Sequence, residues 1–223
     1  QTVDMGRLAQ VPRFDRLSII EDACHALGGM HSGLNGEMVA VGSNAFAEIS
    51  TFSFHPVKTV AMGEGGAITT NDPDLATRFR VLRNIGMTRE PETFQINEQA
   101  FDSRGKANPW YYEMGLPGFN YRLSDISAAL GVSQLRKLDR FVDDRNILVA
   151  EYDRQIKQLS PHVQPLRKVP KYKIGWHLYS VLIDFVGQGS FPFPFNWVTG
   201  NVWDRALIGT NEFTGAQGNG TLP

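Results

Sequence analysis

Short apolar runs alternate with segments of helical periodicity along this chain of 223 residues. Residues 17–20 and 49–54 are rich in apolar, β-branched and aromatic side chains, which is typical of buried strands. A third strand-like run, residues 67–70, follows glycines that permit a tight, hairpin-like entry. Strands that alternate with helices predict an α/β sheet.

The helical segments carry clear start signals. Asp72 is a good N-cap, Pro73 suits the first helical position, and apolar residues then recur at helical spacing until Gly86. Ser124 can cap a second helix, and a further amphipathic stretch covers residues 141–159. The apolar residues on one side of the second helix are Ile126, Leu130, Leu135 and Leu138.

Three segments lack helical periodicity. Residues 88–110 are polar and irregular, and we expect a mobile or active-site loop there. Prolines mark a connector over residues 161–170, after which residues 176–185 alternate as a strand should. Residues 186–223 show neither helical nor strand periodicity, and we expect a poorly ordered or non-native tail.

Composition excludes several classes of function. The formal net charge of −1 gives no case for nucleic acid as a main partner, since binding a nucleic-acid backbone needs a basic face. Cys24 is the only cysteine, so no intrachain disulfide and no metal site of paired thiolates can form. No apolar stretch is long enough to span a membrane, and no signal-peptide pattern opens the sequence. We therefore expect a cytoplasmic protein without a metal.

Lys58 is the first candidate for chemistry. It ends the run of residues 52–58 and lies five residues after Ser53. A lysine in a buried site can form a Schiff base with an aldehyde, and a nearby hydroxyl can bind phosphate. Pyridoxal phosphate carries both groups. Most lysines are solvated surface charges, so this segment alone does not establish a cofactor site.

Asp22 follows the first predicted strand, and ligands of α/β sheets bind beyond the carboxyl ends of strands. A carboxylate there can pair with a pyridine nitrogen and keep the ring an electron sink. A surface acid or an N-cap is the alternative. His25 could contact the same ring or serve as a structural histidine, and Ser53 could bind phosphate or be a satisfied strand serine.

Three ordered motifs carry a resemblance to a known family. Residues 21–29, residues 53–58 with 63–67, and residues 118–125 resemble the DegT/DnrJ/StrS family of pyridoxal-phosphate-dependent nucleotide-sugar aminotransferases. The resemblance covers roughly residues 17–185. It implies the aspartate aminotransferase fold (fold type I), an α/β architecture with a mixed, mostly parallel sheet.

The resemblance also implies roles for individual residues. Lys58 would be the Schiff-base lysine and the proton shuttle. Asp22 would pair with the pyridine nitrogen, His25 would lie against the cofactor, and Ser53 would bind its phosphate.

Two further roles follow from the same resemblance. Asn120 would reach the phosphate of the neighbouring subunit's cofactor, which implies a homodimer whose active sites are shared. His177, within the segment 176–179, would lie on the substrate side and bind the substrate.

The reaction that the resemblance implies is transamination of a UDP-linked 4-keto-6-deoxy sugar, with glutamate as the amino donor. The form of residues 53–58 is most similar to the branch that acts in pseudaminic acid biosynthesis. Two alternatives stay open. One is a sugar dehydratase that uses the same cofactor, against which the lysine at position 58 argues. The other is a catalytically impaired fragment that acts as a cofactor-binding or subunit-interaction remnant.

Set against the family, the chain divides into three parts. Residues 1–160 would be part of the large cofactor-binding domain, and residues 161–185 the start of the small C-terminal domain. Residues 186–223 do not match. The fold is therefore expected to be incomplete at both ends.

Overall fold

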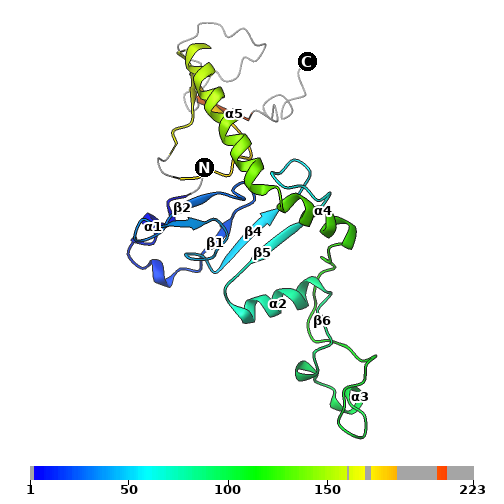
Figure 1. The fold of residues 1–223 in the computed structure, drawn as a ribbon. Coiled ribbons are helices and arrows are strands. Elements are labelled where there is room, and N and C mark those ends of the chain that lie inside the picture. Colours follow the sequence, from blue (N-terminus) through cyan, green and yellow to red (C-terminus); the bar gives the residue numbers. More distant parts are fainter. Residues whose placement is uncertain (1–2, 160, 169–171, 185–204, 210–223) are drawn as a thin grey trace, which may run out of the picture.

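A computed structural model describes residues 3–159, 161–168, 172–184 and 205–209 (Figure 1). Its main sheet has three strands in the order β1-β4-β5. These strands are β1 (Ile20–Asp22), β4 (Ile49–Ser53) and β5 (Gly66–Thr69). β1 runs parallel to β4, and β5 runs antiparallel to β4. The predicted mixed α/β sheet is confirmed.

The predicted strands agree with this sheet to different degrees. β4 and β5 confirm the runs at 49–54 and 67–70. The strand predicted at residues 17–20 is correct only at its last residue, because β1 begins at Ile20 and continues through Asp22. Leu17 and Ile20 are exposed rather than buried. The physical reason is that β1 is an edge strand of the described sheet, with β4 as its neighbour on one side.

A small hairpin beside the sheet was not predicted. It consists of β2 (Met30–Ser32) and β3 (Met38–Ala40), with α1 (Met5–Leu8) packed against it and the short helix η1 (Phe14–Arg16) following α1. Its turn needs the left-handed backbone of Gly36, at φ 83°. The Asn-Gly pair at this turn was the sequence signal for a hairpin.

The three main helices confirm the predicted helical segments. α2 (Pro73–Arg83) begins after Asp72, whose carboxylate accepts from the backbone N–H groups of Asp74 and Leu75. α4 (Asp125–Leu135) begins after Ser124, whose hydroxyl accepts from the N–H of Ser127. α5 (Leu138–Leu159) follows almost at once and starts three residues before the predicted stretch. Leu138, which was predicted on the second helix, therefore belongs to α5, because α4 ends at Leu135.

Residues 88–110 extend away from the main sheet as a largely irregular segment (Figure 1). The strand pair β6 (Met87–Thr88) and β7 (Glu113–Met114) joins its two ends. The segment contains two short helices, η2 (Pro91–Thr93) and α3 (Asn97–Ala100). The Glu113 carboxylate accepts from the backbone N–H groups of residues 95 and 96, both at 2.8 Å. Specific hydrogen bonds therefore tie the predicted loop to its own base.

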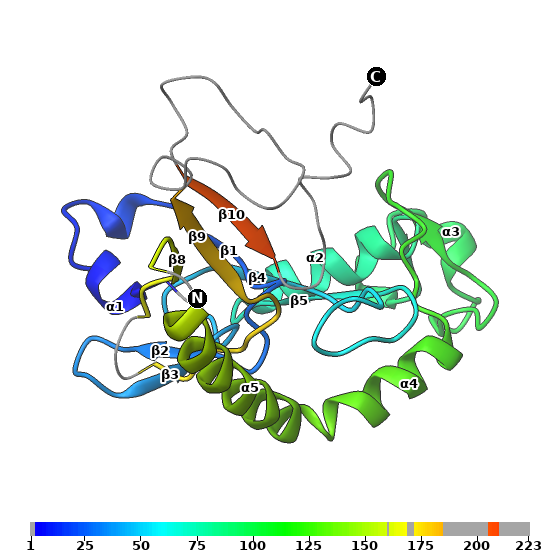
Figure 2. The same cartoon turned by 90° about the horizontal axis from the view of Figure 1, so that it is seen from above.

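A second sheet lies beside α5, in the order β10-β9-β8 (Figure 2). β9 (Ser180–Asp184) confirms the later part of the strand predicted at 176–185, whereas residues 176–179 are not in a strand. β8 (Val163–Pro165) lies inside the predicted connector, and β10 (Arg205–Gly209) lies inside the predicted tail. Both pair antiparallel with β9, so the expectation of no regular structure is wrong for residues 205–209.

The physical reason is that β9 supplies a backbone edge, and backbone pairing does not require an alternating side-chain pattern. The remaining residues of the predicted tail, 186–204 and 210–223, lie outside the described residues.

The described part of the chain has two hydrophobic cores, and α5 reaches both. The first core covers the main sheet and consists of Ala23, Val41, Phe52, Phe54, Val60 and Met62, with Leu138 of α5 packed against it. The second lies between α5 and the second sheet and consists of Val149, Ile174, Trp176, Tyr179, Val181 and Ile183. The start of α5 thus belongs to one core and its later turns to the other.

Candidate active site

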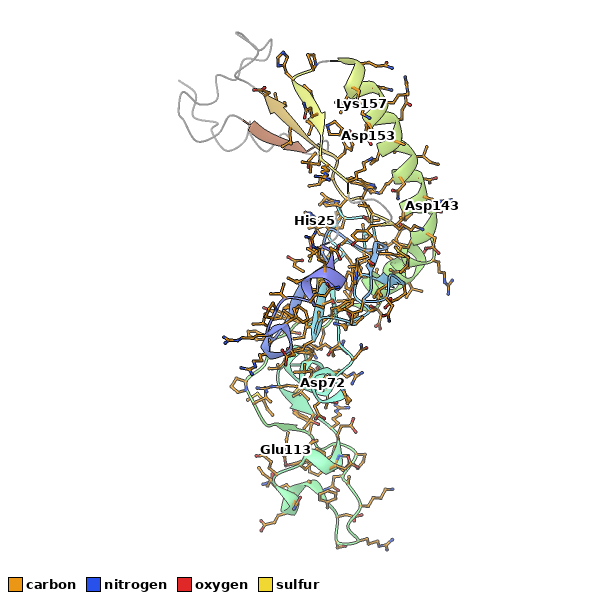
Figure 3. All side chains as sticks on the ribbon, turned by 90° about the vertical axis from the view of Figure 1, so that its left-hand side faces the viewer. His25, Asp72, Glu113, Asp143, Asp153 and Lys157 are labelled. Carbon is orange, nitrogen blue, oxygen red and sulfur yellow. The ribbon has the colours of Figure 1, made fainter. Side chains whose placement is uncertain are left out.

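Lys58, His25 and Asp22 meet at the carboxyl edge of the parallel strand pair. Asp22 is the last residue of β1, and Lys58 lies five residues beyond the end of β4. The Nζ atom of Lys58 lies 2.6 Å from Nε2 of His25, within hydrogen-bond distance. Figure 3 places His25 between Asp72, beside the main sheet, and Asp153 on α5. The parallel pairing of β1 and β4 therefore brings the two sequence motifs together.

Local hydrogen bonds fix the loop that carries Lys58. The backbone N–H of Lys58 donates to the carbonyl of His55 at 2.9 Å, and the N–H of Met62 donates to the carbonyl of Phe54 at 3.0 Å. Thr59 and Val60 directly after the lysine are buried. Buried residues on both sides of a tight turn leave the half-buried lysine at the sheet edge.

The carboxylate of Asp22 is held in its charged form. Its Oδ1 atom accepts from the backbone N–H of Cys24 at 3.1 Å. Hydrogen bonds from the side chain and backbone of Cys24, followed by the neighbouring His25 ring and the positive charge of Lys58, lower the pKa of Asp22. An ionised acceptor at this position can pair with a cationic nitrogen.

Two histidine rings lie in edge contact beside the lysine. The ring centroids of His25 and His177 are 4.4 Å apart at an interplanar angle of 65°. Partial burial and the positive charge of Lys58 lower the pKa of His25. Burial, followed by the neighbouring His25 ring and the positive charges of Lys58 and Arg145, lowers the pKa of His177 to about 4. Both rings are therefore neutral at neutral pH, and Nε2 of His25 can accept a hydrogen bond from Nζ of Lys58.

The structure places the two remaining predicted residues differently. Ser53 ends β4, and its hydroxyl accepts from the N–H of His55 at 3.5 Å, so it belongs to the Lys58 loop. Asn120 bridges Asn84 near the end of α2, and its side-chain oxygen accepts from Nε of Arg122 at 3.0 Å. Among the described residues, no hydrogen bond or ring contact joins Asn120 to the lysine–histidine cluster.

Sequence reasoning missed two polar residues of α5 that contact the segment containing His177. Arg145 and Asn146 hydrogen-bond residues 174–177. Their spacing from Val142 and Val149 puts them on the buried stripe of the helix. Polar residues on an otherwise apolar stripe were the signal that could have identified them.

Comparison with known proteins gives the family. The model of the DegT/DnrJ/EryC1/StrS aminotransferase family matches residues 1–188, a longer stretch than the motifs alone covered. The chain belongs to this family. Aminotransferases of the DegT family use pyridoxal phosphate, and the resemblance of the three motifs is confirmed.

Two curated relatives show the range of the family. The UDP-4-amino-4,6-dideoxy-N-acetyl-beta-L-altrosamine transaminase of Campylobacter jejuni is 33% identical over 183 residues, covering 82% of this chain and 42% of that protein. The GDP-perosamine synthase of Caulobacter vibrioides is 33% identical over 168 residues, covering 73% of this chain and 38% of that protein. Neither name supports the dehydratase alternative.

Solved structures confirm the fold of this DegT-family chain. PseC of Helicobacter pylori, an aminotransferase of pseudoaminic acid biosynthesis, matches with a TM-score of 0.64 and 30% identity. The match covers 82% of this chain and 42% of PseC. The chain thus spans less than half the length of the relatives named here. No helix in the described part of the chain is both long and apolar enough to cross a membrane.

Proposed function

We propose that this chain supplies the cofactor-binding edge of a pyridoxal-phosphate-dependent sugar aminotransferase. The substrate would be a UDP-linked 4-keto-6-deoxy sugar and the amino donor glutamate. The contact of 2.6 Å between Lys58 and His25, beside the charged Asp22, carries this proposal. It supplies an amine, a proton acceptor and a carboxylate at one edge of the sheet.

The residues present fit the cofactor. Pyridoxal phosphate, when bound, supplies a reactive aldehyde and a ring that accepts electrons during transamination. Asp22 is ionised, which suits a protonated pyridine nitrogen. Ser53 presents a hydroxyl for phosphate on the same loop as Lys58. The donor set of this edge therefore matches the separate chemical groups of the cofactor.

Lys58 and His25 together can hold and move a proton. The lowered pKa of His25 keeps its ring neutral, so Nε2 accepts a hydrogen bond from Nζ of Lys58. A lysine whose amine is oriented in this way can donate a proton and take it back at one atom. His177 packs against His25 and thereby restricts where the His25 ring can turn.

The homodimer and the role of Asn120 are part of the same proposal. Exposed apolar side chains gather before and along α4, where Phe119, Tyr121, Ile126 and Val132 are 57%, 72%, 86% and 52% exposed. Such a surface is typical of a protein–protein contact. A second subunit seated there would approach Asn120, which lies on the same stretch of chain.

The proposed sugar and nucleotide of the substrate rest on the similarity to named relatives. One printed name describes a UDP-linked amino sugar and another a GDP-linked one. The similarity to the Campylobacter transaminase and to PseC supports a UDP-linked substrate in pseudaminic acid biosynthesis. Parallel assays with UDP- and GDP-linked 4-keto-6-deoxy sugars compare the two nucleotides directly.

Reductive trapping tests the cofactor site. We expect the purified chain, incubated with pyridoxal phosphate and then borohydride, to carry the phosphopyridoxyl group on the peptide containing Lys58. Lys58→Gln should lose this label, whereas Lys157→Gln, at an exposed lysine on α5, should keep it. Labelling spread over several lysines, or unchanged labelling of Lys58→Gln, would refute the assignment.

An assay of amination then distinguishes an active aminotransferase from a chain that only binds the cofactor. We expect glutamate-dependent amination of the UDP-linked keto sugar to disappear in Lys58→Gln. Labelling of Lys58 without any amination would favour the cofactor-binding remnant and contradict the catalytic part of the proposal.

A further inference from the structure

Residues 174–177 precede β9 and do not belong to a strand. Ile174, Trp176 and His177 are only 5%, 8% and 7% exposed. A buried segment outside a sheet has no neighbouring strand to satisfy its carbonyl groups, and unpaired buried carbonyls are costly. The partners must come from elsewhere in the chain.

Two adjacent side chains of α5 supply these partners. Nδ2 of Asn146 donates to the carbonyl of Ile174 at 3.1 Å, and its Oδ1 accepts from the indole N–H of Trp176 at 3.1 Å. Nη1 of Arg145 donates to the carbonyls of Trp176 and His177, each at 3.2 Å. We call Arg145 and Asn146 the α5 clamp.

The clamped segment touches both loops of the candidate active site. A Cβ atom at Gly175 would lie 2.4 Å from the carbonyl oxygen of Leu27, so only glycine permits this approach to the His25 loop. The segment also contacts the Lys58 loop. Thr59, the residue directly after Lys58, donates from its hydroxyl to the carbonyl of Trp176 at 3.5 Å. The segment therefore lies between the loops that carry His25 and Lys58.

We propose that Arg145 and Asn146 are positioning residues that hold His177 against His25, and so fix the orientation of the His25–Lys58 pair. This rests on the proposed function for its catalytic meaning, but the positioning itself is a property of the chain alone. The clamp acts through the backbone of residues 174–177, because its polar atoms contact the carbonyls on both sides of the His177 peptide.

The acid–base behaviour of His177 gives a direct readout. The titratable or charged groups that act on this ring are His25, Lys58 and Arg145, and burial has the largest influence on its pKa. If the clamp is removed, the ring should gain access to water and its pKa should rise toward the ordinary histidine value of about 6.5. A change at Asn146 is informative because this side chain carries no charge of its own.

The experiment is a titration of the histidine ring signals by nuclear magnetic resonance, on the chain without pyridoxal phosphate. We expect the pKa of His177 to rise by more than one unit in Asn146→Ala and in Arg145→Met. Arg145→Lys keeps a donor near the two carbonyls and should restore most of the original value. Arg140→Met, on the exposed part of the same helix, should leave His177 unchanged.

A second measurement separates this inference from the proposed function. The pH profile of Lys58 labelling by pyridoxal phosphate and borohydride should shift in Asn146→Ala and Arg145→Met but not in Arg140→Met. If the unaltered chain shows no labelling, the proposed function fails while the titration still tests the clamp. An unchanged pKa of His177 in folded Asn146→Ala and Arg145→Met overturns the clamp. Asn146→Ser replaces Asn146→Ala if the latter does not fold.

Discussion

The consecutive helices α4 and α5 differ in the burial of their apolar residues. α5 buries one apolar face and leaves Ile147 and Leu148 exposed at 69% and 54%, whereas the large apolar residues of α4 are all exposed. On α5, Val142 and Val149 are 1% and 5% exposed. On α4, Ile126 and Val132 are 86% and 52% exposed, although this helix begins at a clear N-cap, Ser124. Both segments are helical, but only α5 has a buried apolar face.

The two helices differ in burial because they have different packing partners within the chain. α5 packs between two cores and meets Trp176 and the second sheet. α4 meets Met62, whose side chain lies against Gly131, while the rest of its apolar surface faces outward. An apolar helix face that stays exposed in one chain is typical of a contact surface, which agrees with the proposed homodimer. α5 is therefore packed inside the described part of the chain, whereas the exposed side chains of α4 form the surface on which the proposed homodimer depends.

The largest expected effect on stability comes from placing a charge at a buried valine of α5. Val149→Asp should lower the free energy of unfolding by about 4 kcal/mol, because it leaves an unpaired charge in the second core. That is a large fraction of the about 5–15 kcal/mol typical of a domain. Urea unfolding followed by circular dichroism measures it.

Val132→Asp on α4 is the matched control. The change should alter the free energy of unfolding by less than about 1 kcal/mol, because this side chain is already half exposed. Equal destabilisation by the two variants would contradict the contrast between the helices.

Low pH should reduce the free energy of unfolding, because His177 is buried beside α5 in its neutral form. Its folded pKa of about 4 lies below the ordinary value of 6.5, so the unfolded chain binds the proton more readily between these values. Stability is fully present above about pH 6.5 and should fall by about 2 kcal/mol as the pH drops toward 4.5. The lowered pKa of His25 acts in the same direction.

Urea unfolding at several pH values measures this loss. His177→Gln should flatten the curve between pH 6.5 and 4.5, while His55→Gln, at an exposed histidine, should not. Asp22 contributes in a lower window, because its lowered pKa preserves its stabilising charge until the pH falls below the ordinary range of aspartate. A pH-independent stability over the upper window would contradict the burial of His177.

The smallest effect on stability, and the one most specific to α4, concerns association. Ile126→Lys should change the free energy of unfolding of one chain by less than about 0.5 kcal/mol, because the side chain is 86% exposed. It should nevertheless weaken the proposed dimer, measured by sedimentation equilibrium. Ile147→Lys, at a position 69% exposed on α5, is the control and should leave association unchanged. A dimer insensitive to Ile126→Lys would place the interface elsewhere.

The sequence predicted much of this fold because its signals are local. The N-caps Asp72 and Ser124 and the β-branched run of β4 depend on neighbours along the chain, and all three are confirmed. β8 and β10 escaped prediction because their regularity comes from pairing with β9 rather than from their own pattern. The exposure of β1 escaped because an apolar run does not reveal whether its strand lies at an edge.

The candidate site shows the same division. The motifs around Asp22, His25 and Lys58 indicated the residues, and the parallel pairing of β1 and β4 brought them to one edge. The contact of His177 with His25 joins residues far apart in sequence, and the hydrogen bonds of Arg145 and Asn146 to its segment do the same. No periodicity reports such contacts, because they depend on how two cores meet along α5.

By itself, then, the sequence determined the family, the starts of α2 and α4, the central strands and the chemical types of the site residues, since each of these depends on a short motif. Tertiary structure alone decided that His177 is buried and neutral, that α5 holds its backbone, and that α4 keeps an apolar face exposed. The physical reason is that burial and desolvation depend on which distant segments pack together, and a residue's own neighbours in sequence do not fix that packing.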